Sequence, residues 1–192
     1  MRVKEFCKIR MGYAFRKRLE NVSDGDVKVI QPKNISENGA LSFEDEEPLI
    51  TNVSSPNPIL MGDVLVVNRG RFASTVFNLF DAGPWIVPSS ILILSINDKS
   101  VLSEYVSLYF NSENGQKLFR RHLERTTVPF ISTINLGNMD IPVPPMKKQQ
   151  ALVNFETTNR KYAKLSNKKL ELQRQILSHE LTKAERSIQR RK

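Results

Sequence analysis

The chain has 192 residues, a hydrophobic content of 40% and a formal net charge of +9 at pH 7, which predicts one globular domain with an appendage. No stretch approaches the ~18 uninterrupted apolar residues of a membrane-spanning helix, and the charged N-terminal segment has no apolar core of the kind that a secretory signal needs. The single cysteine, Cys7, excludes an internal disulfide and fits a reducing cytoplasm, which is the location we expect.

The first half of the chain predicts short strands that are separated by turns. Val3–Ile9 is compatible with a short strand or a helical turn, and Val27–Ile30 alternates like a strand. Ile59–Val67 predicts a turn that leads into a strongly apolar strand, and Thr75–Phe80 is its expected hairpin partner.

The middle of the chain predicts a buried strand and then a helix. Trp85–Val87 and Ser90–Ile96 together read as one central, nearly all-apolar strand. Ser103–His122 predicts an amphipathic helix with Ser103 as its N-cap and a break near Gly115. Extended structure is expected again over Ile131–Pro144.

The stretch that ends at Gln150 contains the most abrupt change in the chain, because three prolines separate a mixed sequence from a tract without Gly or Pro. Pro144 disfavours the helical region for Val143, so Ile141–Pro144 is expected to be extended. Pro145 is suited to a first helical turn. We therefore predict a domain over residues 1–144 and a long helix over residues 145–192.

The helical tract follows a heptad seam, with a second apolar stripe at Leu165, Leu172 and Ile176. Several seam positions are small or polar, which favours an antiparallel pair with a wider partner stripe. A single surface helix folded back on its own domain is the alternative. The apolar and small seam positions are Ala163, Leu170, Leu177, Leu181, Ala184 and Ile188.

The net charge is concentrated on this tract. From Lys147 onward there are 13 basic and 4 acidic residues, whereas residues 1–146 are neutral overall. A basic surface can attract nucleic acid, an anionic membrane or an acidic protein, and the charge alone does not choose among them.

Four sequence features occur in a characteristic order. Gly12 and Phe15 precede Val29–Ile35, Gly62-Asp63 opens an apolar strand, and Ser103–Phe110 begins the helix. The most specific feature is Ile-Pro-Val-Pro-Pro-Met-x-x-Gln at residues 141–149. In these features the chain resembles one half of a DNA-specificity (S) subunit of a type I restriction–modification system. It departs from the family pattern at Lys147-Lys148, where acidic residues are common.

The resemblance implies an α/β (α+β) target recognition domain followed by a long C-terminal coiled-coil spacer helix. It implies sequence-specific binding of double-stranded DNA, with a methyltransferase (modification) subunit and, through it, a restriction subunit as partners. A chain with one recognition domain would form a homodimer through antiparallel helices and bind a bipartite, interrupted palindrome.

Basic and polar residues in predicted loops and at a helix end are the expected DNA contacts, because cations neutralise phosphate and arginine can read base edges. Gly70 would let the backbone approach a ligand closely. The candidates are Arg16, Lys17, Arg18, Lys33, Arg69, Arg71, Arg120, Arg121, Arg125 and Thr127.

No catalytic residue, metal site or cofactor is expected. His122 and His179 are far apart in the sequence, and neither a nucleophile elbow nor a glycine-rich phosphate loop is present. The chain therefore reads as a non-catalytic subunit. Two other hypotheses are a coiled-coil protein-interaction adaptor without DNA sequence specificity and a small nuclease whose site has no recognisable motif.

Overall fold

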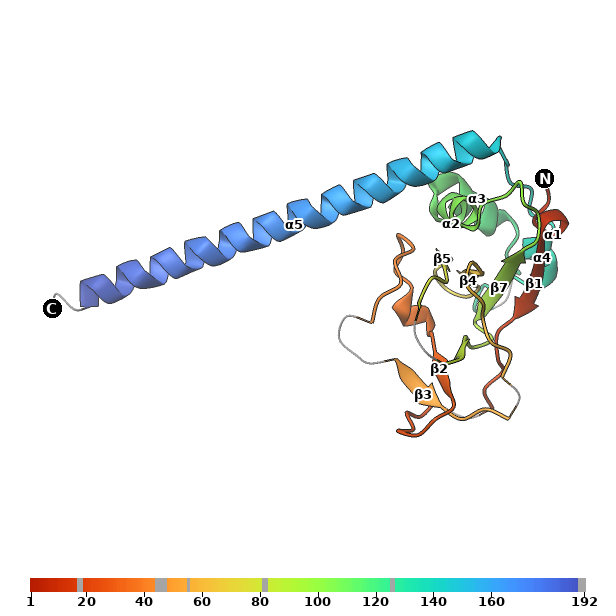
Figure 1. The fold of residues 1–192 in the computed structure, drawn as a ribbon, viewed down its shortest axis with the longest axis horizontal. Coiled ribbons are helices and arrows are strands. Elements are labelled where there is room, and N and C mark those ends of the chain that lie inside the picture. Colours follow the sequence, from red (N-terminus) through yellow and green to blue (C-terminus); the bar gives the residue numbers. More distant parts are fainter. Residues whose placement is uncertain (17–18, 44–47, 55, 81–82, 125–126, 190–192) are drawn as a thin grey trace. The chain divides into compact units, whose positions relative to one another are not determined.

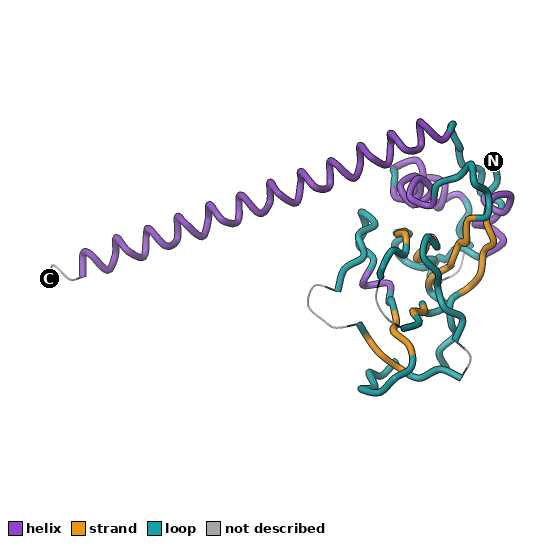
Figure 2. The backbone as a smooth tube through the Cα atoms, in the orientation of Figure 1, coloured by secondary structure: helices purple, strands orange, loops and turns teal. Residues whose placement is uncertain are grey.

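The continuous apolar runs of the sequence form the two central strands of a four-stranded sheet with the order β1-β7-β4-β5 (Figures 1 and 2). The structure is a computed structural model that describes residues 1–16, 19–43, 48–54, 56–80, 83–124 and 127–189, without the side chains of residues 180 and 184–189. The chain divides into two compact units, Met1–Gln150 and Ala151–Lys192. The elements are α1 (Val3–Phe6), β1 (Cys7–Met11), β2 (Val27–Val29), the 3-10 turn η1 (Pro32–Asn34), β3 (Leu49–Thr51), β4 (Val64–Val67), β5 (Ser74–Val76), β6 (Trp85–Ile86), β7 (Ile91–Ile96), α2 (Ser103–Asn111), α3 (Glu113–Arg121), α4 (Thr133–Gly137) and α5 (Met146–Gln189).

All neighbouring strands of this sheet are antiparallel. Ile9 of β1 pairs with Leu94 of β7, and Ile93 of β7 pairs with Leu65 of β4. Leu65 in turn lies opposite Thr75 of β5. The antiparallel order brings the end of β1, the start of β7, the end of β4 and the start of β5 to the same end of the sheet.

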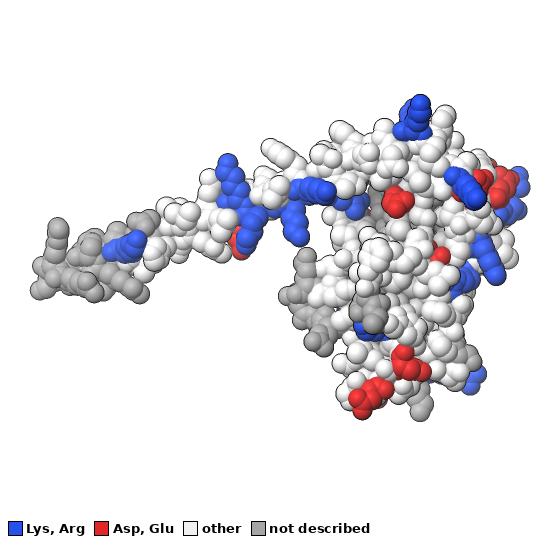
Figure 3. Space-filling model, in the orientation of Figure 1, with Lys and Arg blue, Asp and Glu red and all other residues white. Residues whose placement is uncertain are grey.

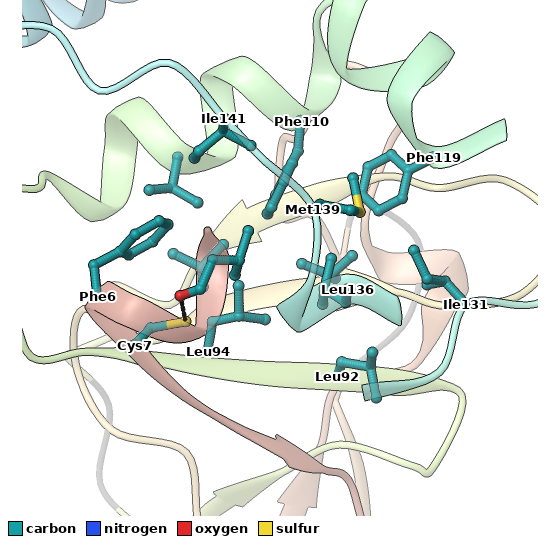
Figure 4. Close-up of a cluster of buried hydrophobic side chains, with 14 of the residues drawn as sticks. Phe6, Cys7, Leu92, Leu94, Phe110, Phe119, Ile131, Leu136, Met139 and Ile141 are labelled. Carbon is teal, nitrogen blue, oxygen red and sulfur yellow. Dashed lines mark hydrogen bonds between the residues drawn. The ribbon is translucent and has the colours of Figure 1, made fainter. Parts of the chain in front are cut away.

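Both faces of the sheet are buried. Val66, Leu92 and Leu94 point to the face that α1 to α4 cover, where they meet Phe110 and Phe119 (Figure 4). The alternate residues of the same strands pack on the opposite face against a layer that includes Trp85. Each fully buried aliphatic side chain contributes about 1.5–3 kcal/mol of transfer free energy. Burial on both faces explains why these strands are apolar at nearly every position.

A second sheet has the order β3-β2-β6. β2 pairs antiparallel with β3 and parallel with β6. Val27, Val29 and Ile86 form its small core, against which Tyr13 and Phe15 pack. The sequence does not predict β3, which has only three residues and is placed by its pairing with β2.

The structure corrects the expectation of one strand over residues 85–96. Trp85–Ile86 is β6 in the three-stranded sheet, whereas Ile91–Ile96 is β7 in the four-stranded sheet. Pro88 lies between them and cannot donate to a strand ladder, so it separates the two strands.

The predicted helix over Ser103–His122 is two helices. The break lies at Ser112 instead of near Gly115, and the Ser112 hydroxyl accepts a hydrogen bond from the Gly115 amide as the N-cap of α3. Ser103 is not an N-cap, because the cap position of α2 is Leu102.

The expectation of extended structure throughout Ile131–Pro144 is wrong for Thr133–Gly137, which forms α4. Ser132 caps this helix by accepting a hydrogen bond from the Asn135 amide. The Asn135 side chain donates to the His122 carbonyl at 2.9 Å, so tertiary contacts stabilise a helix too short to show a period.

The proline corner before α5 has no regular secondary structure, and the helix begins at Met146. Gln149 is completely buried and accepts a hydrogen bond from the Leu102 amide at 2.9 Å. It donates to the carbonyls of Ser100 and Pro144, both at 2.8 Å. One side chain therefore ties the first turn of α5 to the corner and to the start of α2.

An amide side chain also covers the edge strand β5. Asn111 accepts a hydrogen bond from the Ser74 amide at 2.9 Å and donates to the Ser74 carbonyl at 2.8 Å. Gln116 donates to the nearby Phe72 carbonyl at 2.7 Å. These helix side chains pair with strand backbone in the way that a neighbouring strand would.

Candidate nucleic-acid interface

One end of the four-stranded sheet gathers segments that lie far apart in the sequence. The Tyr13 amide, after β1, donates to the Val87 carbonyl, before β7, at 2.7 Å. The Asn68 amide, after β4, donates to the Ser90 carbonyl at 3.0 Å. We call this the loop end of the sheet, and most of the sequence-predicted DNA contacts lie on the segments that it joins.

Arg69 lies exposed in the hairpin turn between β4 and β5. Its guanidinium lies over the Phe130 ring, with 5.3 Å between Cζ and the ring centroid. Arg69 and Phe130 also form an antiparallel β-bridge, and the Ile131 amide donates to the Asn68 carbonyl at 2.9 Å. The exposed Thr127 lies on the segment that these contacts bring to the turn.

Gly70 gives the turn its shape. Its φ is +73°, a conformation that favours glycine, and a Cβ added there would meet no atom within 4 Å. Gly70 is therefore needed for the backbone conformation of the turn, and the space beside its Cα is open.

Arg71 has a different environment. Its Nη2 donates to the carbonyls of Pro32 at 3.0 Å and Ile35 at 2.5 Å. These bonds fasten η1, which carries the exposed Lys33, to the hairpin turn.

The remaining candidates are distributed as follows. Arg16 is exposed on the segment after β1, and Lys17 and Arg18 lie outside the described residues. Arg120 and Arg121 are exposed in the last turn of α3, where cations complement the helix dipole. Arg125 also lies outside the described residues.

Sequence reasoning did not identify two residues of the loop end. Phe130 lies between a proline and an isoleucine, and no local pattern distinguishes it from a core aromatic. Asn68 is buried at the end of β4, and its Oδ1 has no hydrogen-bond partner among the described residues. Only the pairing of β4 with the segment before α4 brings the two residues together.

The Gly62-Asp63 feature serves the fold. The buried Asp63 carboxylate accepts hydrogen bonds from Arg10 Nη2 at 2.9 Å and from the Ser95 hydroxyl at 2.7 Å. It also accepts one from the Leu60 amide at 2.9 Å. Asp63 therefore holds the turn before β4 and is not placed for a ligand.

The apolar seam of α5 lies at the surface. Leu170, Leu177 and Leu181 are exposed by 52%, 61% and 58%. Ala163 and the second stripe of Leu165, Leu172 and Ile176 are exposed as well, whereas the side chains of Ala184 and Ile188 lie outside those described. Basic side chains outnumber acidic ones along the described part of the helix (Figure 3).

Two surveys of the described residues bear on other functions. No group of three or more His, Cys, Asp or Glu side chains is arranged to hold a metal ion. None of the helices has the length and apolar character needed to cross a membrane.

Residues 1–174 match the type I restriction modification DNA specificity domain family. The chain belongs to this family. The match covers all of the first unit and the first two thirds of α5, so it includes the loop end and the proline corner. No curated protein shows significant sequence similarity to the chain.

Solved structures, two of them of S subunits, have the same fold. A chain from a study of the complex assembly and conformational transition of the type I system aligns with a TM-score of 0.63 at 21% identity, over 84% of this chain and 38% of that one. The HsdS subunit of Thermoanaerobacter tengcongensis gives 0.60 at 20% identity, over 84% and 37%. The S subunit of M. genitalium gives 0.51 at 13% identity, over 81% and 37%.

The chain thus spans less than two fifths of the length of these three solved chains. The predicted combination of an α/β domain and a long C-terminal helix is confirmed. Pairing of that helix with a second copy stays a prediction.

Proposed function

We propose that this S-family chain is a DNA-recognition component of a type I restriction–modification complex. It binds double-stranded DNA sequence-specifically through the loop end of its sheet. It directs separate methyltransferase and restriction subunits to a bipartite target and carries out no chemistry itself.

The observation that carries the proposal is the convergence of segments with predicted DNA contacts at the loop end. The hairpin turn with Arg69, the η1 turn with Lys33 and the segment with Thr127 are joined there by backbone and side-chain contacts. The unit that holds them has no net charge excess up to residue 146, so a general electrostatic field cannot supply its affinity for DNA. Locally placed cations must supply that affinity.

The second part of the proposal is a homodimer through antiparallel α5 helices. The exposed leucines of the seam support it, since such a stripe is normally covered by a partner. A helix of 44 residues is about 66 Å long, which is enough to hold two recognition domains on successive turns of a duplex. Two-fold symmetry then requires a palindromic, interrupted target.

The test is selection by the full chain from a library of duplexes with a randomised central stretch. The expected result is one enriched motif with two inverted half-sites, bound more tightly than the starting library. Lys99→Ala is a matched control, because this exposed lysine lies in the turn after β7, at the opposite end of the sheet. It should leave the enriched motif unchanged.

The outcomes separate the competing functions. Equal affinity for enriched and starting duplexes, with capture of an acidic protein by α5, would favour the interaction adaptor. Cleavage of the library that depends on a divalent metal would favour a nuclease. Either result contradicts sequence-specific recognition as the function.

A further inference from the structure

The two arginines that flank Gly70 differ in what their guanidinium groups contact. Arg71 directs Nη2 at two backbone carbonyls of the η1 region, so its side chain is part of the fold. The Arg69 side chain has no hydrogen bond or ion pair to any of the described residues, and its guanidinium lies over the Phe130 ring. Sequence reasoning treats the two as equivalent, and the structure separates them.

A cation–π contact with an aromatic ring does not use the N–H groups of a guanidinium in hydrogen bonds to other protein groups. The N–H groups of arginine lie in the guanidinium plane and can donate to an acceptor at its edge. The ring restricts the side chain to fewer rotamers, which lowers the entropy lost when an acceptor binds. Arg69 is therefore exposed, restrained and free to donate.

The backbone under both partners is fixed. The Asn68 carbonyl accepts from the Ile131 amide, and the Phe130 carbonyl accepts from the Glu124 amide at 2.9 Å. The Asn68 amide is held by the Ser90 carbonyl. Three separate segments therefore set the distance between Cα of Arg69 and the Phe130 ring.

We propose that Arg69, positioned over the Phe130 ring, reads a guanine in the major groove, with Phe130 as its positioning residue and Arg71 as a structural brace. The inference rests on the proposed function. A rigid fork of two in-plane donors matches the O6 and N7 acceptors of guanine, and no other base presents two acceptors there. The recognised half-site therefore contains a G·C pair that depends on this one side chain.

The experiment uses the motif enriched by the wild-type full chain and duplexes with each of its base pairs changed in turn. Arg69→Lys keeps the charge and loses the fork. It should weaken binding to the enriched duplex about 5- to 150-fold and abolish the preference at one G·C pair. Binding to random duplexes and its salt dependence should stay unchanged, because the phosphate contacts are retained.

Variants of Phe130 test the positioning role. Phe130→Leu removes the ring and should lose the preference at the same base pair, whereas Phe130→Tyr keeps the ring and should retain it. Arg71→Ala should lower the unfolding midpoint and leave that preference intact. Fluorescence of Trp85, the single tryptophan, reports whether each variant is folded.

Four results would overturn the inference. A wild-type motif without a G·C pair in its half-sites removes the base that Arg69 would read. Retention of every base preference by Arg69→Lys removes its reading role, while sequence-specific binding by the wild type would still stand. Loss of one preference in Arg69→Lys but not in Phe130→Leu removes the positioning role of the ring. If the wild type enriches no motif, the proposed function fails and the inference fails with it.

Discussion

Replacement of Gln149 by alanine should destabilise the first unit substantially. The side chain is completely buried and makes three hydrogen bonds, to the Leu102 amide, the Ser100 carbonyl and the Pro144 carbonyl. Each such bond contributes about 0.5–1.5 kcal/mol net, so losing all three should lower the free energy of unfolding by about 1.5–4.5 kcal/mol. The three backbone groups would remain in place without a partner.

Urea denaturation of the full chain, followed by Trp85 fluorescence, measures this effect, because Trp85 lies in the core of the first unit. Gln149→Met keeps most of the side-chain volume and should be nearly as destabilised as Gln149→Ala, which separates hydrogen bonding from packing. Lys148→Ala, at an exposed neighbouring position, is the control. A change of less than about 0.5 kcal/mol in both Gln149 variants would refute the reasoning, since surface substitutions produce changes of that size.

Three further predictions concern the helix and the buried thiol. Leu177→Asp places a charge in the apolar seam and should convert a dimer to a monomer in sedimentation. Gln175→Asp lies off the seam and should leave the dimer intact. A dimer in both variants would contradict dimerisation through the seam. Burial raises the pKa of Cys7 from 9.0 to about 12, so a thiol reagent at neutral pH should label it only after unfolding. The pKa of Cys7 is higher in the folded than in the unfolded state. The buried thiol therefore contributes to the free energy of unfolding below about pH 9, and this contribution is lost as the pH rises towards 12. Unfolding curves measured at alkaline pH would show the loss. Replacement of Lys164, Lys168 and Lys169 by alanine should weaken binding equally on all DNA sequences and flatten the salt dependence of binding. A loss that depends on the DNA sequence would instead assign base contacts to the helix.

Sequence patterns predict the elements here where one local feature dominates. The prolines before α5 set the helix start, and the apolar run of β4 with its hairpin partner identifies two neighbouring strands. Sequence patterns do not predict α4, because this helix depends on Ser132 as a cap and on the Asn135 contact with His122. The prediction of one strand over residues 85–96 is also wrong, although Pro88 is a signal that could have divided that strand.

The candidate site is predictable in composition but not in arrangement. Exposed arginines beside Gly70 are visible in the sequence, and they suffice to nominate the hairpin turn. The distinction between Arg69 and Arg71 depends on contacts with Phe130 and Pro32, each more than thirty residues away along the chain. Such contacts follow from the strand order β1-β7-β4-β5, which no local pattern encodes.

The pairing of Asn111 with Ser74 has a consequence for the behaviour of the protein at high concentration. A strand at the margin of a sheet presents unpaired amides and carbonyls to which a strand of another molecule can add, and this is a route to aggregation. In β5 the outward amide and carbonyl of Ser74 are already bonded to the Asn111 side chain, and Gln116 occupies the Phe72 carbonyl. Two helix side chains thus occupy outward backbone groups of Phe72 and Ser74 at this margin, and they do so without adding a residue to the sheet.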